Sequence, residues 1–165
     1  MSAEITPART TVRSTLSETG QKAVQHALQP QLVDLLDLTL TAKQLHWNVV
    51  GADFKPVHEH LDELVAQYRI WSDDVAERLT AVGVPADGRV QRVAGDSPAD
   101  PAPASWLHST EAVRTMTDRI EAVARATRER LDGIGEHDPA SEDLLISILQ
   151  GLEQQLWMFS AQLAD

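Results

Sequence analysis

The chain has 165 residues and no cysteine, and its 25 Asp and Glu residues outnumber its 14 Lys and Arg residues. This length suits one domain with a real core, and the missing thiols exclude disulfides, thiolate zinc sites, iron–sulfur clusters and cysteine nucleophiles. An acidic surface repels phosphate, so duplex DNA is not an expected partner of the folded body. No apolar run could span a membrane or form a signal-peptide core, which predicts a cytoplasmic protein.

The first 25 residues are polar and rich in Ser and Thr, which predicts a mobile arm before a helical domain over residues 26–165. From about residue 28 to residue 49, apolar side chains recur at three- and four-residue spacing, which predicts the first helix. Pro30 is compatible with this helix only in its first turn. Asn48 to Gly51 supply stop residues at the other end.

Asp53 is a suitable N-cap for a second helix that ends at Val82, before Gly83. Residues 84–108 hold repeated Pro and Gly, which predicts a long crossover with a short helix near Ser105–Leu107. A third helix is expected over about 109–132, and a fourth starts from Asp138 or Ser141 as its cap. Long helices with one long middle link predict an all-α, ferritin-like up-down-down-up four-helix bundle.

The second predicted helix carries two pairs of candidate metal ligands. His58 and Asp62 are four residues apart, and so are Asp73 and Glu77. At about 100° per residue, all four side chains fall in roughly one quadrant of the helix, about 145° from its apolar stripe. Imidazole with carboxylate suits iron, manganese or zinc. The alternative interpretation is a charged face that only meets solvent.

The spacing of these pairs limits how they can act. Asp62 and Asp73 are eleven residues apart, or about 16 Å along the helix axis. Metal–ligand bonds are only about 2 Å long, so both pairs cannot hold one ion within a single chain. An antiparallel second subunit would bring Asp73 and Glu77 of one chain to His58 and Asp62 of the other, giving two equivalent sites per interface. His46, at the end of the first helix, can complete the first half.

Three spaced segments closely resemble the Dps family of mini-ferritins: LHWNVVG at residues 45–51, FKPVHEHLDEL at 54–64 and DDVAERL at 73–79. The resemblance extends over about residues 28–164 and includes features of the last helix at 143–145 and 156–157. It implies a four-helix subunit in a hollow homo-dodecamer, with an iron-oxidising centre at each two-fold interface. The ligands implied are His46, His58 and Asp62 from one subunit and Asp73 and Glu77 from its partner.

The resemblance also implies an activity. Members of the family oxidise Fe(II), preferably with hydrogen peroxide and otherwise with oxygen, and store the ferric mineral inside the shell. This removes the reagents that form hydroxyl radicals and so protects DNA. In the family, acidic residues near the start of the last helix line pores for iron entry, and Asp138 and Asp143 are the candidates here. Acidic residues at a helix N-terminus are also simply favourable to the helix dipole.

Aromatic residues and the other histidines receive simpler interpretations. Trp47 is near the site and could intercept radicals, but core packing is the preferred interpretation. Trp71 and Trp157 are expected in the core. His60 lies off the ligand quadrant and is expected to be an ordinary surface histidine.

DNA binding is where the chain departs from the family's namesake behaviour. Glu4, Arg9, Arg13 and Glu18 sum to zero charge in the first 20 residues, and no tail is expected after the last helix. We therefore expect weak or no duplex binding. Two alternatives stay open: a non-enzymatic, nucleoid-associated protein that shields DNA, and a bundle that binds manganese or zinc without turning over iron.

Overall fold

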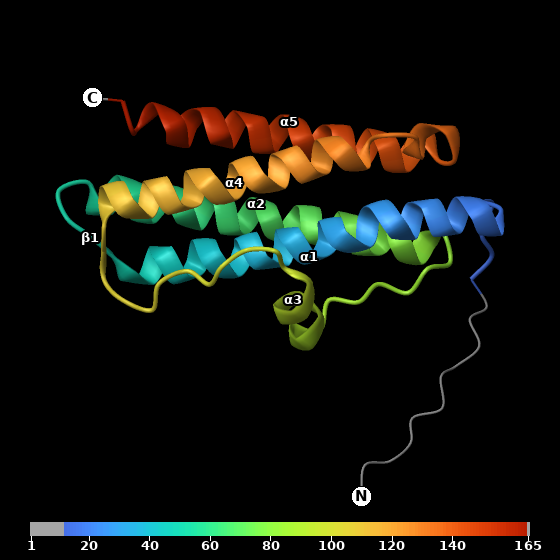
Figure 1. Ribbon diagram of the computed structural model, residues 1–165, viewed down its shortest axis with the longest axis horizontal. Coiled ribbons are helices and arrows are strands. Elements are labelled where there is room, and N and C mark those ends of the chain that lie inside the picture. Colours follow the sequence, from blue (N-terminus) through green and yellow to red (C-terminus); the bar gives the residue numbers. More distant parts are fainter. Residues whose placement is uncertain (1–11, 165) are drawn as a thin grey trace, which may run out of the picture.

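The computed structural model describes residues 12–164, which form a helical bundle (Figure 1). The elements follow in the order α1 (Glu18–Asn48), β1 (Val49–Val50), α2 (Phe54–Ala81), α3 (Val90–Asp96), β2 (Leu107–His108), α4 (Ser109–Arg130), the 3-10 turn η1 (Ile134–Glu136) and α5 (Pro139–Ala161). Helices α1 and α2 run antiparallel, α4 runs in the direction of α2, and α5 returns (Figure 1). This is the predicted up-down-down-up bundle.

Helix α1 begins ten residues before its predicted start. Ser17 is the N-cap, and its hydroxyl accepts a hydrogen bond from the Gly20 N–H at 3.2 Å. Val24 and Ala27 are buried, so the extra turns pack against the bundle. Residues 18–25 thus belong to α1 and not to the predicted arm, whose residues 1–11 lie outside the described residues. The early turns bury small side chains, which give only a weak apolar pattern.

Pro30 lies inside α1, so its predicted place in the first turn is wrong. A proline in a helix interior has no N–H for the carbonyl four residues back, here that of His26, and its ring crowds that carbonyl. The helix continues because the neighbouring Leu28 and Leu32 are buried in the core. Burial of apolar side chains therefore outweighs the local preference to stop the helix.

The crossover between α2 and α4 lies along α1 and is tied to it by polar contacts. The Gln29 side chain donates to the Asp87 carbonyl and accepts from its N–H, both at 2.9 Å. Gln44 donates to the Pro103 carbonyl at 3.2 Å, and β1 pairs in parallel with β2, Val49 opposite Leu107. The crossover's helix is α3, not the predicted one at 105–107. Residues 97–106 hold three prolines, which remove backbone donors that a helix needs.

The core lies between the helices. Of the three tryptophans predicted to lie in it, one does. Trp71 is buried on α2, but Trp157 is 66% exposed and Trp47 63% exposed, so their assignment to the core is wrong. Trp71 lies directly against the backbone of α5, where Gly151 leaves room for its indole ring. A Cβ atom at position 151 would lie 2.4 Å from the ring.

Gly151→Ala should therefore destabilise the bundle. The new methyl group would force the buried indole or helix α5 to shift, at a cost of about 1–3 kcal/mol in the free energy of unfolding. Gly95→Ala is the matched control, because a Cβ there meets nothing within 4 Å. Urea unfolding followed by circular dichroism measures both. Equal stability of the two variants would contradict this close packing.

Candidate metal centre

The turn between α1 and α2 brings two of the predicted ligands together. Gly51 in this turn has a φ of 115°, a backbone conformation open to glycine. The chain reverses there, and His46 near the end of α1 meets His58 in the first turns of α2. Their rings stack with centroids 3.7 Å apart and planes 20° apart. His46 is buried and His58 is partly buried.

Reciprocal hydrogen bonds fix the orientation of these two rings. The Nδ1 atom of His46 lies 2.8 Å from the His58 carbonyl oxygen, and Nδ1 of His58 lies 2.9 Å from the His46 carbonyl oxygen. A carbonyl only accepts hydrogen bonds, so each Nδ1 must carry the proton and donate it. The lone pair of each imidazole is then on Nε2. A histidine held in this way is preorganised as a metal ligand.

Asp62 lies one turn further along α2 and lines the same surface hollow as the histidines. The hollow has a volume of about 420 Å³ and is also lined by Glu59, Glu63 and Ala66. Lys43 of α1 forms an ion pair with the Asp62 carboxylate. Its hydrogen bond and positive charge lower the pKa of Asp62 below the ordinary value, and the nearby imidazoles act in the same direction. Asp62 is therefore a carboxylate, the form that binds cations.

Asp73 and Glu77 do not join this group within one chain. Both are exposed on α2, as the helical wheel predicts. Over residues 12–164, no three or more His, Asp or Glu side chains are close enough to hold a metal ion. The two ligand pairs are nevertheless placed symmetrically along α2. His58 lies as many residues before the midpoint between Gln67 and Tyr68 as Glu77 lies after it.

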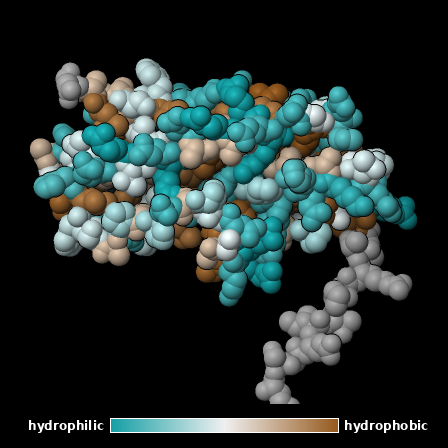
Figure 2. Space-filling model, in the orientation of Figure 1, coloured by the Kyte–Doolittle hydropathy of each residue, from teal (hydrophilic) through white to brown (hydrophobic). Residues whose placement is uncertain are grey.

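Two large apolar side chains are exposed on α1 and α2. Leu40 is 61% exposed and Ile70 is 56% exposed. Asp73 lies at a neighbouring hollow of about 530 Å³, which Leu32, Leu36 and Ile70 also line. The face seen in Figure 2 is mostly hydrophilic, with hydrophobic residues in separate patches.

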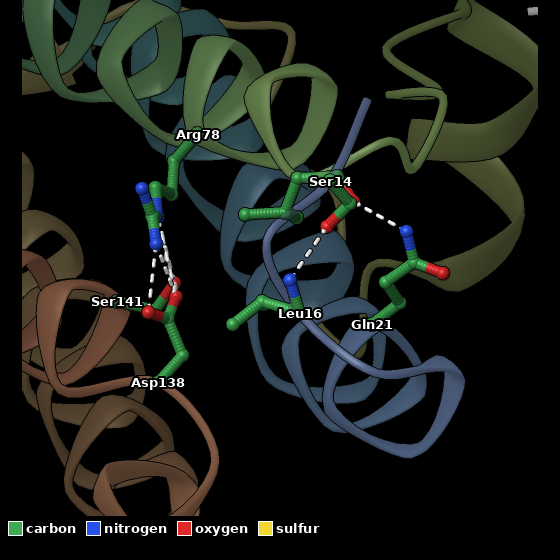
Figure 3. A network of polar contacts seen from close by, with 7 residues as sticks. Ser14, Leu16, Gln21, Arg78, Asp138 and Ser141 are labelled. Carbon is green, nitrogen blue, oxygen red and sulfur yellow. Dashed lines mark hydrogen bonds and ion pairs between the residues drawn. The ribbon is translucent and has the colours of Figure 1, made fainter. Parts of the chain in front are cut away.

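At the opposite end of α2, a polar cluster joins α2 to α5. Arg78 binds the Asp138 carboxylate through Nη2 at 2.6 and 2.7 Å and donates from Nε to the Ser141 hydroxyl at 3.1 Å. Figure 3 shows the guanidinium reaching both residues at the start of α5. Asp138 is also the residue before the helix, as predicted, although its side chain makes no capping hydrogen bond. In the same view, Ser14 accepts from the Leu16 N–H, and Gln21 reaches toward the end of α2.

Comparison with known proteins decides the family. A model of the ferritin family, described as a ferritin-like domain, matches residues 25–165. The DNA protection during starvation protein of Mycolicibacterium smegmatis is 34% identical over 152 residues, which cover 90% of this chain and 81% of that protein. The chain belongs to the Dps family. The structure titled Dps from Microbacterium arborescens in the high iron form has a TM-score of 0.88 at 31% identity and covers 93% of this chain and 100% of that one.

Another relative is longer than this member of the Dps family. DNA protection during starvation protein 2 of Deinococcus radiodurans is 32% identical over 156 residues, which cover 94% of this chain but only 64% of that protein.

Among the described residues, no helix is long and apolar enough to cross a membrane.

The polar cluster at Arg78 includes Asp138, one of the two predicted pore residues. Asp138 is buried and both its carboxylate oxygens bind Arg78, so in this chain it is a structural ion-pair partner and does not offer a free carboxylate to a pore. Asp143 is exposed on α5 and remains a pore candidate.

Two further polar residues were not identified from the sequence. Lys43 is three residues before His46, a spacing that places both on one face of α1 and could have drawn attention to it. Arg78 directly follows Glu77, but nothing local indicates its contact with α5. His60 is also not an ordinary surface residue, because its ring packs on Phe159 with centroids 4.6 Å apart, and burial lowers its pKa.

Asp138→Asn should change stability in a pH-dependent way. Burial alone would raise the pKa of Asp138, but hydrogen bonds from Arg78 and Ser141 bring it below its ordinary 3.8. The stabilisation is therefore complete well above pH 3.8 and is lost as the pH falls through the lower folded-state pKa. At neutral pH the variant should lose about 3 kcal/mol, and its stability should fall less steeply in acid than that of the wild type.

Unfolding by urea at several pH values measures both effects. Asp143→Asn on the same helix is the control and should match the wild type throughout. An acid dependence of Asp138→Asn as steep as that of the wild type would contradict the assignment.

Proposed function

We propose that this protein is a ferroxidase of the Dps type, which oxidises Fe(II), preferably with hydrogen peroxide, and stores the ferric mineral inside a homo-dodecameric shell in the cytoplasm. The observation that carries the proposal is the half-site formed by His46, His58 and Asp62. Its two imidazoles present Nε2 lone pairs beside a carboxylate, and the proposed complementary pair, Asp73 and Glu77, lies on the same helix at the same distance from the Gln67–Tyr68 midpoint.

The ligand set suits Fe(II) as a substrate. Imidazole nitrogen is a good ligand for Fe(II), and carboxylate oxygen stabilises Fe(III) more than Fe(II), which favours oxidation. His46 and His58 would hold the ion through Nε2, with Asp62 beside them. Two Fe(II) ions would each give one electron to a hydrogen peroxide molecule, whose O–O bond breaks, and two protons taken up from water would complete two water molecules.

A second copy of the chain would supply the other ligands. Ile70 is exposed on α2 between the two ligand pairs, and Leu40 is exposed on α1, so a partner's α2 packed there would bury apolar side chains. Burial of large apolar side chains is the usual source of stability in permanent interfaces. The two-fold relation of the pairs about the Gln67–Tyr68 midpoint then gives two complete centres per interface.

Removal of the proposed partner ligands should abolish the catalysed reaction. Asp73→Ala with Glu77→Ala should lower the rate of Fe(II) oxidation by hydrogen peroxide at least about tenfold, because each centre loses half of its ligands. Anaerobic protein, mixed with Fe(II) and then with peroxide or air, is followed by ferric absorbance. Asp118→Ala with Glu121→Ala, an exposed acidic pair on α4, is the matched control. A wild-type rate in the first variant would rule out the assigned centre.

Mixed assemblies can show that the centre is shared between chains. His58→Ala with Asp62→Ala and Asp73→Ala with Glu77→Ala should each be inactive alone. When the two variants are dissociated and reassembled together at random, half of the interfaces pair one chain of each kind and contain one intact centre of two. The mixture should therefore regain about one quarter of wild-type activity. No recovery in mixed shells of confirmed composition would contradict a shared centre.

DNA shielding without catalysis is the alternative function, and the chain's charge argues against it. The net charge is −11, and the acidic surface repels phosphate. We expect no stable complex with duplex DNA in a gel-shift assay at about 150 mM salt. Stoichiometric condensation of DNA at that salt concentration would favour the alternative. Metal analysis of the purified protein distinguishes an iron protein from one that holds manganese or zinc.

A further inference from the structure

The ammonium group of Lys43 lies at the Asp62 carboxylate, where a metal ion bound in the half-site would be expected. Its ammonium is bound to the Asp62 carboxylate, on the wall of the hollow that His46 and His58 also line. We propose that Lys43 is the counter-ion of the metal-free half-site, and that a divalent cation binds by displacing the ammonium from Asp62. This proposal rests on the proposed function and concerns how the same site receives its metal.

The placement of Lys43 follows from two matching helix positions. It lies one turn before His46 on α1, and Asp62 lies one turn after His58 on α2. Because the two helices are antiparallel, the His46–His58 stack and the Lys43–Asp62 ion pair are successive contacts across the same helix pair. The ammonium is thus held beside the imidazoles by the geometry of the hairpin.

An empty half-site needs a positive charge at this point. Asp62 shares its hollow with Glu59 and Glu63, and in the proposed assembly the partner's acidic pair would come close as well. Like charges this close repel one another, and the repulsion is strongest where solvent is excluded. Glu59 is already paired with Lys55, so Lys43 is the cation that neutralises Asp62.

The ammonium and a metal ion cannot occupy the Asp62 carboxylate together. A bound divalent ion would lie about 2 Å from the carboxylate oxygen, and an ammonium on the same group would be strongly repelled by it. Lysine has a flexible stem and a single-point charge, so it can swing out to solvent, whereas an arginine would hold a carboxylate through two hydrogen bonds. Lys43 therefore holds Asp62 in position in the metal-free site, and its ammonium moves away from the carboxylate when the metal binds.

The exchange has a measurable consequence for metal affinity. Every divalent cation that uses Asp62 must break the ion pair and then bind near a displaced positive charge. Lys43→Gln should therefore tighten binding of Co²⁺, a redox-inert substitute for Fe(II), by about tenfold. Asp62→Asn should weaken binding. In the Asp62→Asn background, Lys43→Gln should change the affinity less than about twofold, because the carboxylate it blocks is absent.

The experiment is a titration of the metal-free, full-length protein with Co²⁺, followed by the visible absorbance of the bound ion. Lys22→Gln is the matched control, since it removes an exposed lysine of the same helix, 21 residues before Lys43 and so about 31 Å away along the axis, and should leave the affinity unchanged. Thermal unfolding gives a second readout: Lys43→Gln should lower the midpoint of the metal-free protein but not that of the Co²⁺-loaded protein. A merely structural lysine would lower both.

Three results would overturn the proposal. These are wild-type or weaker Co²⁺ affinity in Lys43→Gln, a gain in affinity that persists in the Asp62→Asn background, and no Co²⁺ binding in any variant. The titration involves no oxidant, so its result is separate from the tests of ferroxidase activity. A failed oxidation assay with an intact Lys43 effect would reject the proposed function alone, and the reverse pattern would reject only the role of Lys43.

Discussion

The inward packing of α2 is the constraint on which the rest of the molecule depends. Its apolar stripe, from Val57 to Leu79, is buried along the whole helix, so the opposite arc must remain at the surface. Both ligand pairs, His58 with Asp62 and Asp73 with Glu77, lie on this arc and cannot approach each other within one chain. A rigid helix therefore separates the half-sites, and a centre with all five side chains requires two chains.

The sequence predicts which candidate ligands share a helix face, because that pattern depends only on helical geometry. Four-residue spacing places His58 with Asp62, and Asp73 with Glu77, whatever the helix packs against. The bounds of α2 and α4 follow for the same reason, from strong stripes with clear stop residues. The shared centre itself stays a prediction.

Features that depend on tertiary contacts were predicted poorly. The start of α1 is stabilised by burial of small residues, and Pro30 is retained inside the helix by the packing around it. Trp47 and Trp157 have the hydrophobicity of core residues, yet the bundle leaves them exposed. The partners of Lys43, Arg78 and Asp138 lie on other helices, and local periodicity contains no information about such contacts.

Contacts with neighbouring helices hold α2 at both of its ends. Near its start, the His58 carbonyl and imidazole are both hydrogen-bonded to His46 of α1. Near its end, Arg78 is bound to Asp138 of α5, and the carbonyl of Val82 accepts a hydrogen bond from Gln21 at 2.8 Å. The helix is held at both ends by different neighbours, and its interior turns are held by the core. The helical rise sets the spacing of about 16 Å between Asp62 and Asp73, and these contacts fix the position of the helix between α1 and α5. A two-fold partner would have to match that spacing at two centres at once, so the rigid helix would also set the register of the proposed interface.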